Sequence, residues 1–420
     1  MYLGIDLGTS GVKVLLIDEQ QSIVDNASAA ISVSNPQHGW SEQDPASWIS
    51  ATTSALGELS QRCDLAAVKG IGLSGQMHGA TLLDAKAQVL RPCILWNDVR
   101  SYAEADALNA NPQFQKITGN VVFPGFTAPK LAWCKTHERE CFEQIDKVLL
   151  PKDYLRLWLT GEMVSDMSDA SGTSWLDVGQ RQWSSELLQA TGLSESAMPQ
   201  LVEGSQVSGQ LRSGVAEQFG LSTSVVVAGG AGDNAASACG LGTVKPGAAF
   251  ASLGTSGVLF VSNEGFKPNP ESAVHAFCHA IPERWHQMGV ILSATDSLNW
   301  YSRLVGVDAA DLTGALGNTL REPASVTFLP YLSGERTPHN DAHIRGVFSG
   351  ITTSSNQADL TQAVLDGVSF AFRDNLNALT AAGTRLERVT AVGGGSQSDY
   401  WLSSLATCLN LPVDVLSDGE

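Results

Sequence analysis

Two identical six-residue segments contain the small and hydroxyl-bearing residues that suit a phosphate-binding turn. Residues 7–12 and 253–258 both read Leu-Gly-Thr-Ser-Gly-Val. Backbone amides in such a turn, together with the Thr and Ser hydroxyls, can bind the oxygens of a phosphate group. The two copies are too far apart for a solenoid repeat, so we predict two related domains. The pattern is neither the Walker-type P-loop nor the dinucleotide-binding fingerprint.

Asp6 ends the run before the first copy and stands beside the expected turn. A carboxylate there can hold a hydrated Mg²⁺ that also binds phosphate oxygens, and Lys13 adds a positive charge. The residues expected at the turns are Gly8, Thr9, Ser10 and Gly11 in the first copy and Gly254, Thr255 and Ser256 in the second. A structural alternative stays open, in which Asp6 caps the turn and the glycines only satisfy its backbone angles.

Asp233 follows four small residues, at 229–232, and begins an expected helix. Glycines let a ligand approach the backbone closely, and a carboxylate at this point can accept the proton of a hydroxyl group that attacks phosphorus. Aspartate is also a preferred N-cap residue of helices. The residue pattern alone favours the cap and leaves the general base open, and the two roles are compatible.

Two further glycine-containing segments could contact a ligand. Gly393, Gly394 and Gly395 stand between an expected strand and helix, where the lack of a Cβ lets the backbone approach a planar base or a ribose. The alternative is a plain tight turn. The segment Gln76-Met77-His78 is flanked by glycines after an expected strand at 68–73, and its Gln and His side chains suit a hydroxyl-rich ligand. A histidine held in the core is the alternative for His78.

Other polar residues have weaker patterns. Asp44 and Pro45 suit the N-cap and first position of a helix. A set of polar and aromatic residues could line a cleft, although their spacing does not establish it: Trp96, Asp98, Arg100, Asp166 and Asp169.

Strands and helices alternate around these residues, so we predict an α/β fold. In each copy one β-prone run leads into the Gly-Thr-Ser-Gly turn and another follows it, so each copy reads as a β-hairpin. These runs are 2–5 and 12–17, then 248–253 and 258–261. A helix at 358–382 is predicted from apolar residues that recur every four positions, with Gly383 at its C-terminal end. Further elements are a strand at 389–392, a helix at 400–409 and a strand at 225–228. Clustered Gly and Pro put the domain boundary near 240–247.

Composition sets the class of protein and excludes several partners. The 420 residues are 43% hydrophobic and carry a formal net charge of −18. An acidic chain lacks the clustered Lys and Arg that nucleic acid or an anionic membrane requires, so we expect neither as a partner. Seven scattered cysteines without a Cys-x-x-Cys pair fit neither a disulfide framework nor a zinc site. No signal peptide or membrane-spanning run is recognised, and we expect a cytoplasmic protein.

Taken together, these segments resemble the FGGY family of carbohydrate kinases, which have the fold of the actin-like ATPases, and within it the members that phosphorylate D-xylulose. The resemblance extends along the whole chain. The glycine-rich turns and Asp6 are typical of the superfamily, and the Gln-Met-His segment is typical of the pentulose branch. The matching segments are residues 4–10, 75–84, 94–98, 125–130, 150–156, 232–236 and 331–339.

The resemblance implies two actin-like, ribonuclease H-like lobes with a cleft between them and transfer of phosphate from MgATP to D-xylulose, giving D-xylulose 5-phosphate. Asp233 would be the proton acceptor, and Met77, His78 and Asn234 would contact the ketose with it. Asp6 would organise Mg²⁺. The first turn with Lys13 would meet one side of the phosphates, the second turn would meet the other, and Gly393, Gly394 and Gly395 would lie against the adenosine.

We therefore expect a sugar-binding lobe at 1–242 and a nucleotide-binding lobe at 243–420. The alternatives are another FGGY kinase, acting on ribulose, gluconate, fuculose or glycerol, or a non-catalytic actin-like ATP-binding protein. A homodimer is implied by the family alone. Val99 replaces a usual glycine, which questions Arg100 as a sugar contact. The chain also ends several dozen residues before family members normally stop, so a truncated nucleotide-binding lobe that lacks a packed element is expected.

Overall fold

One β-sheet carries the first hexapeptide. In the computed structural model, which describes residues 1–416, β1 (Tyr2–Leu7) pairs antiparallel with β2 (Gly11–Ile17), and β2 pairs antiparallel with β3 (Ile23–Ala30). On its other side β1 pairs parallel with β5 (Gly70–Gly75), which pairs parallel with β14 (Val226–Ala228). The turn between β1 and β2 is therefore the predicted glycine-rich hairpin.

A second sheet repeats this arrangement around the second hexapeptide. There β16 (Ala248–Leu253) pairs antiparallel with β17 (Gly257–Asn263), and β17 pairs antiparallel with β19 (Trp285–Ile291). On its other side β16 pairs parallel with β22 (Arg388–Val392), and β22 pairs parallel with β23 (Val413–Val415). These five strands have the same order and the same relative directions in both sheets, so the repeated hexapeptide marks a repeated structural unit, as predicted.

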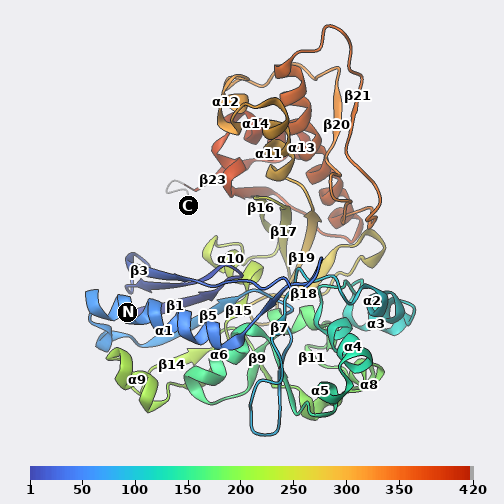
Figure 1. Ribbon diagram of the computed structural model, residues 1–420. Coiled ribbons are helices and arrows are strands. Elements are labelled where there is room, and N and C mark those ends of the chain that lie inside the picture. The colour runs from blue at the N-terminus through green and yellow to red at the C-terminus, as the bar shows by residue number, and fades with distance from the viewer. Residues whose placement is uncertain (417–420) are drawn as a thin grey trace. The chain divides into compact units, whose positions relative to one another are not determined.

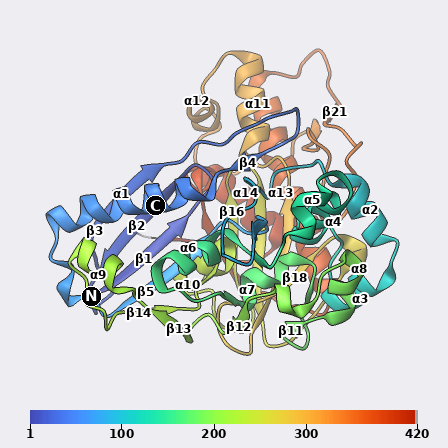
Figure 2. The ribbon, with the colours of Figure 1, turned by 60° about the horizontal axis from the view of Figure 1, so that its bottom comes forward.

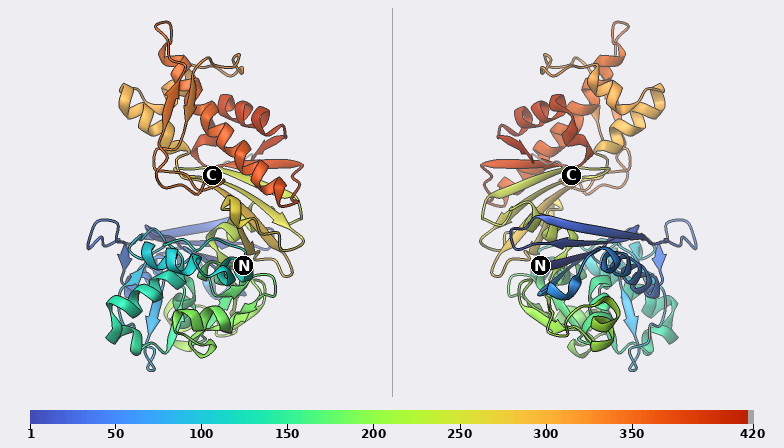
Figure 3. Two further views of the ribbon diagram at one scale, coloured as in Figure 1. Left: turned by 90° about the vertical axis from the view of Figure 1, so that its right-hand side faces the viewer. Right: turned by 90° about the vertical axis from the view of Figure 1, so that its left-hand side faces the viewer.

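The chain forms two units, shown in Figures 1 and 3. The first comprises Met1–Cys239 and a returning segment, Phe277–Arg284; the second comprises Gly240–Ala276 and the chain from Trp285 onward. The sequence analysis expected one domain boundary, after residue 242, and did not expect residues 277–284 to return to the first unit. Ala280 in this segment packs with Ala231 and Ala235 of the first unit.

Long helices cover the sheets. Helix α1 (Pro45–Arg62) packs on β2 and β3, as Figure 2 shows, and the Asp44 side chain accepts a hydrogen bond from the Ala46 amide at its N-terminus, as predicted. In the second unit α13 (Gln357–Ala381) begins with a capping box between Asn356 and Asp359. Its predicted apolar face is confirmed, because Val364, Val368 and Phe372 are buried in the core.

Helix α14 (Asp399–Leu409) lies beside α13, and α10 (Asp233–Gly240) follows the small-residue loop in the first unit. A second core of the first unit is formed largely by short helices between the strands. The remaining helices are α2 (Tyr102–Asn109), α3 (Pro112–Thr118), α4 (Thr127–His137), α5 (Arg139–Glu143), α6 (Pro151–Thr160), α7 (Met167–Ala170), α8 (Ser185–Thr191), α9 (Ser213–Phe219), α11 (Thr295–Val305) and α12 (Ala309–Gly314).

The remaining strands are mostly short. They are β4 (Glu42–Gln43), β6 (Thr81–Leu83), β7 (Cys93–Ile94), β8 (Lys147–Leu149), β9 (Val164–Asp166), β10 (Leu176–Asp177), β11 (Gln182–Trp183), β12 (Gln200–Val202), β13 (Val207–Gln210), β15 (Ala231–Gly232), β18 (His275–Cys278), β20 (Thr327–Leu329) and β21 (Val347–Ser349). Among the described residues, no helix combines the length and apolar character needed to cross a bilayer.

Candidate active site

Three parallel strands of the first unit bring the candidate residues to one edge of the sheet. Strands β1 and β15 both pair parallel with β5, and Ser74 of β5 is the partner of both Asp6 and Ala231. Asp6 lies at the carboxyl end of β1, and Asp233 directly follows β15. Ligands of open α/β sheets bind outside the carboxyl ends of the strands. This edge is therefore the place where a substrate would meet both carboxylates.

The Asp233 carboxylate has the properties of a general base. Its side chain is exposed, and its Oδ1 accepts hydrogen bonds from the Asn234 amide at 2.6 Å and from the Asn234 side chain at 2.9 Å. Surrounding protein that displaces water, with a further contribution from the Asp6 charge, raises the pKa of Asp233 to about 6. Helix α10 begins at Asp233 itself, so the carboxylate lies in the first turn of the helix, where negative charge is favourable.

The loop that leads to Asp233 requires glycine. Gly230 has a φ of +75°, and a Cβ there would lie 2.2 Å from the Leu73 carbonyl oxygen. At Gly232 a Cβ would lie 2.8 Å from the Met77 sulfur. The small residues thus let the loop pack directly on β5 and on the Met77 side chain.

His78 is fixed on several sides. Its backbone has a φ of +69°, its Nδ1 lies 2.8 Å from the Gly172 carbonyl oxygen, and its ring stacks on Phe126 at 4.5 Å. Its carbonyl oxygen accepts hydrogen bonds from Thr127 and from the buried Lys130 ammonium at 2.8 Å. Burial lowers the pKa of Lys130 to about 7. Sequence reasoning gave no role to these partners, although 125–130 was among the segments that carried the resemblance.

Gln76 differs from its expected role. It is buried and holds the first hairpin: Thr9 Oγ1 donates to Gln76 Oε1 at 3.1 Å, and Gln76 Nε2 donates to Gln43 Oε1 at 3.0 Å. Gln43 Nε2 in turn donates to the Thr9 carbonyl oxygen at 2.6 Å. The prediction that Gln76 suits a hydroxyl-rich ligand is therefore wrong, since both ends of its amide bind protein groups.

The first turn has fewer groups to offer than predicted. The Gly8 amide donates to the Gly11 carbonyl oxygen at 3.0 Å and closes the turn, so the expected use of Gly8 for phosphate is not supported by its geometry. Carbonyl and amide groups of one peptide plane point in opposite directions. Because the Thr9 carbonyl oxygen accepts a hydrogen bond from Gln43, the Ser10 amide of the same peptide plane points away from Gln43. Asp6 and Lys13 are cross-strand partners, and both side chains are exposed.

The second turn is supported in a similar way within its own unit. The carbonyl oxygens of Gly254 and Thr255 accept hydrogen bonds from the amides of Thr295 and Ala294, each at 2.9 Å, at the start of α11. The amides of Thr255 and Ser256 consequently point away from α11. Both side chains are exposed, so the turn presents amides and hydroxyls together.

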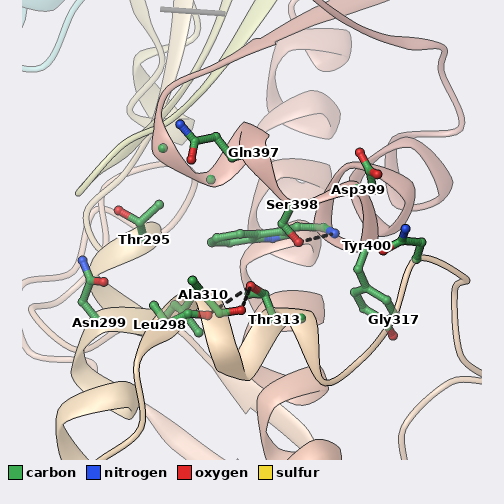
Figure 4. Close-up of a pocket in the computed structure, with 16 residues that line it drawn as sticks. Thr295, Leu298, Asn299, Ala310, Thr313, Gly317, Gln397, Ser398, Asp399 and Tyr400 are labelled. Atoms are coloured by element: carbon green, nitrogen blue, oxygen red, sulfur yellow. Dashed lines mark hydrogen bonds between the residues drawn. The ribbon is translucent and has the colours of Figure 1, made fainter.

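The glycine triplet borders a pocket of the second unit with a volume of about 500 Å³. Figure 4 shows residues of α11, α12 and the start of α14 around this space, including Thr295, Ala310 and Ser398. Gly394 and Gly395 line it. A nucleoside-sized ligand fits a pocket of this volume.

The three glycines have different roles. Gly393 has a φ of +87°, and a Cβ there would lie 2.9 Å from the Leu253 carbonyl oxygen. A Cβ on Gly395 would lie 2.7 Å from the Leu253 side chain, whereas one on Gly394 would meet open space. Gly393 is not among the residues that line the pocket; it joins the triplet to the second hairpin instead.

Several residues considered for a polar cleft are instead buried ion-pair partners. Arg100 binds Asp98 at 2.7 Å and Glu42 at 2.7 Å, and its guanidinium lies over the Trp40 ring at 3.7 Å. Asp166 and Asp169 are fully buried beside Lys152. Trp96 stays exposed and donates to Thr9 Oγ1 at 2.9 Å. The cleft expectation is therefore wrong for the charged residues, and Arg100 is structural.

Asp6 fits the expected magnesium ligand in type and location. Mg²⁺ prefers oxygen ligands and is commonly held by one or two carboxylates together with substrate phosphates. Among the described residues, one group of three carboxylates lies close enough to share a cation, formed by Asp153, Asp166 and Asp169. The Lys152 ammonium already lies within 3.2 Å of an oxygen of each.

Comparison with known proteins agrees with this architecture. The model of the FGGY family of carbohydrate kinases, N-terminal domain, matches residues 1–240, and the C-terminal domain model matches 249–420. The xylulose kinase of Escherichia coli (strain K12) is 52% identical over 422 aligned residues, which span 100% of this chain and 87% of the relative.

Solved structures are similarly close. A xyloylose kinase from Brucella ovis has a TM-score of 0.99 and 63% identity and covers 100% of this chain, which spans 87% of it. A gluconate kinase from Lactobacillus acidophilus has a TM-score of 0.93 and 25% identity. The match covers 99% of this chain and 85% of the gluconate kinase.

Two α/β units with one strand order, each with a glycine-rich hairpin, define the two-domain actin-like kinase fold. The chain belongs to the FGGY family of carbohydrate kinases, since the family models span nearly all of it.

Proposed function

We propose that this carbohydrate kinase phosphorylates D-xylulose at its 5-hydroxyl with MgATP, giving D-xylulose 5-phosphate and ADP. The observation that carries the proposal is Asp233, an exposed carboxylate of raised pKa that follows a glycine loop at the strand ends. The xylulose kinase relatives support the choice of sugar. In the reaction the sugar oxygen attacks the γ-phosphorus, Asp233 accepts the hydroxyl proton and ADP leaves.

Residues of the first unit would bind the sugar, Mg²⁺ and part of the phosphate chain. Met77, His78 and Asn234 would contact the ketose, since His78 is held rigidly and Asn234 fixes the Asp233 carboxylate. Asp6 would hold Mg²⁺, which neutralises phosphate charge during transfer. Ser10 and Lys13 would contact phosphate oxygens, with Thr9 contributing backbone, because its hydroxyl is bound to Gln76.

The second unit would bind the rest of the nucleotide. Thr255 and Ser256 present amides away from α11 and would bind phosphate oxygens. The pocket beside Gly394 would hold the adenosine, and its volume of about 500 Å³ suits a nucleoside. ATP and Mg²⁺ are thus the proposed cosubstrate and cofactor, and we expect a cytoplasmic enzyme, in keeping with seven free cysteines.

A gluconate-phosphorylating kinase is the second candidate within the family, because a gluconate kinase has nearly the same backbone. The test is a coupled assay of ADP release with D-xylulose, D-ribulose, gluconate, L-fuculose and glycerol. We expect the highest kcat/KM with D-xylulose. A higher value with another substrate would overturn the sugar assignment. ADP release without any sugar, together with concentration-dependent assembly, would favour a non-catalytic, actin-like role.

A further inference from the structure

A short segment contacts both the loop before Asp233 and the side chain of His78. The segment spans residues 166–173 and includes α7 and the turn after it. One of its members, Ser168, contacts the loop that precedes Asp233, and another, Gly172, contacts His78. Both contacts join parts of the chain that are far apart in sequence. The segment is therefore placed to fix the general base and the sugar-contacting histidine relative to each other.

The Ser168 hydroxyl links the Asp166 carboxylate to the loop that precedes Asp233. Its Oγ donates to Asp166 Oδ1 at 2.5 Å and accepts from the Gly232 amide at 3.1 Å. Gly232 is the residue immediately before Asp233. Because the Ser168 hydroxyl donates to the Asp166 carboxylate, it is polarised and becomes a better acceptor for the Gly232 amide.

Buried charges hold Asp166 in place. Its Oδ2 lies 2.6 Å from the Lys152 ammonium, which also lies 2.6 Å from Asp153 and 3.2 Å from Asp169. Burial lowers the pKa of Lys152, but the charges of Asp153 and Asp166 outweigh it and raise this pKa, so the side chain stays cationic. Burial, with the charges of Asp153 and Asp166 adding to it, raises the pKa of Asp169 well above its usual range and favours its protonated form.

Arg156 supports the other end of the same loop. It donates to the Ala228 and Gly229 carbonyl oxygens at 2.6 and 2.5 Å and contacts Ser208. The loop from Ala228 to Gly232 is thus bound at both ends by side chains that are buried. The buried charged residues therefore hold the backbone of the loop. The Lys152 ammonium lies among the three aspartates, where a metal ion would otherwise bind.

We propose that Ser168 is a positioning residue for the general base, which it serves by anchoring the Gly232 amide to the buried Asp166–Lys152 pair. This inference rests on the proposed role of Asp233. Without the hydroxyl, the Gly232 amide loses its acceptor, and the loop gains freedom one residue before the carboxylate. A displacement of about 1 Å of a reacting group can cost about a hundredfold in rate.

The test compares Ser168→Ala with Ser165→Ala. Ser165 is a matched control, because it is equally buried on β9 and its hydroxyl has no hydrogen-bond partner among residues 1–416. We expect Ser168→Ala to lower kcat by about tenfold or more with the KM for ATP unchanged, and Ser165→Ala to keep the wild-type kcat. Equal kcat values for both variants and the wild type would overturn the proposal.

A double-mutant cycle separates positioning from a general structural effect. A residue that acts through Asp233 has no further effect once Asp233 is Asn, so Ser168→Ala should leave the residual rate of Asp233→Asn unchanged. A second tenfold loss in that background would contradict the proposal. Ser168→Thr, which keeps the hydroxyl, should restore kcat toward the wild type, and failure to do so would count against the hydrogen bond.

If the alanine variant does not fold, Ser168→Cys replaces it, since cysteine has a similar volume but bonds weakly through sulfur. The same kcat criterion applies to it. The outcomes also distinguish this inference from the proposed function. A wild type without sugar-dependent ADP release refutes the proposed function, whereas an active wild type with unaffected Ser168 variants refutes only the positioning role.

Discussion

At the residue scale, the Asp233 carboxylate combines access with an altered acidity. A general base works best when its pKa is close to the working pH, because it must be ionised and still attract a proton. The structure moves the pKa of Asp233 upward by removing water and by placing the Asp6 charge nearby. Two hydrogen bonds from Asn234 oppose the shift and keep the carboxylate oriented.

The pH dependence of turnover follows from this acidity. Below a pH of about 6 the Asp233 carboxyl is protonated and cannot accept the sugar proton, so kcat should fall about tenfold per pH unit on the acid side. Above that pH the carboxylate is ionised and kcat should level off. The measurement is kcat at saturating sugar and MgATP from pH 5 to pH 8. An acid limb centred near 4, the ordinary range of an aspartate, would contradict the raised pKa.

Sequence reasoning located the residues at strand ends and missed those that support them. Asp6 was singled out because it stands at the end of a β-prone run beside a glycine-rich turn. Asp233 was singled out because it follows four small residues, but its pattern favoured an N-cap, and the role of general base came from the family resemblance. Gln76 was assigned to a ligand, but it bonds to Thr9 and Gln43, which are distant in sequence. Ser168 gave no signal at all. Such partners depend on tertiary contacts that local spacing does not encode.

At the scale of elements, each hairpin turn is tied to its own unit through carbonyl oxygens. The Gln43 side chain donates a hydrogen bond to a carbonyl oxygen of the first turn, and backbone amides at the start of α11 donate to carbonyl oxygens of the second. The hairpins themselves and α13 were predictable, because alternation and four-residue periodicity are local signals. Strand β15 was not, since two small residues form it only by pairing with β5.

The glycine triplet gives a matched pair of substitutions. Gly393→Ala places a side chain at a φ of +87° and against the Leu253 carbonyl, so we expect a lower Tm and weaker ATP binding. Gly394→Leu meets open space at its Cβ and extends into the pocket, so we expect an unchanged Tm with a KM for ATP raised about tenfold or more. Thermal melting and kinetics at varied ATP check both variants. An unchanged KM for Gly394→Leu would exclude this pocket as the adenosine site.

At the scale of the whole molecule, two units that share the order of five strands hold different candidate site residues. The first has the carboxylates and His78, and the second has the glycine-lined pocket. The sequence repeat predicted the duplication. It did not predict that Phe277–Arg284 returns to the first unit, because this packing depends on small apolar residues such as Ala280 that have no distinctive pattern.

The most direct test of the account compares wild type and Asp233→Asn for ADP release with saturating D-xylulose, with nucleotide binding measured on the same preparations. Asparagine keeps the shape of the side chain and removes its ability to accept a proton. We expect kcat to fall by about a hundredfold or more, typical for loss of a general base, with ATP affinity within about twofold of the wild type. A variant that turns over D-xylulose at a near wild-type rate would show that Asp233 is not the general base.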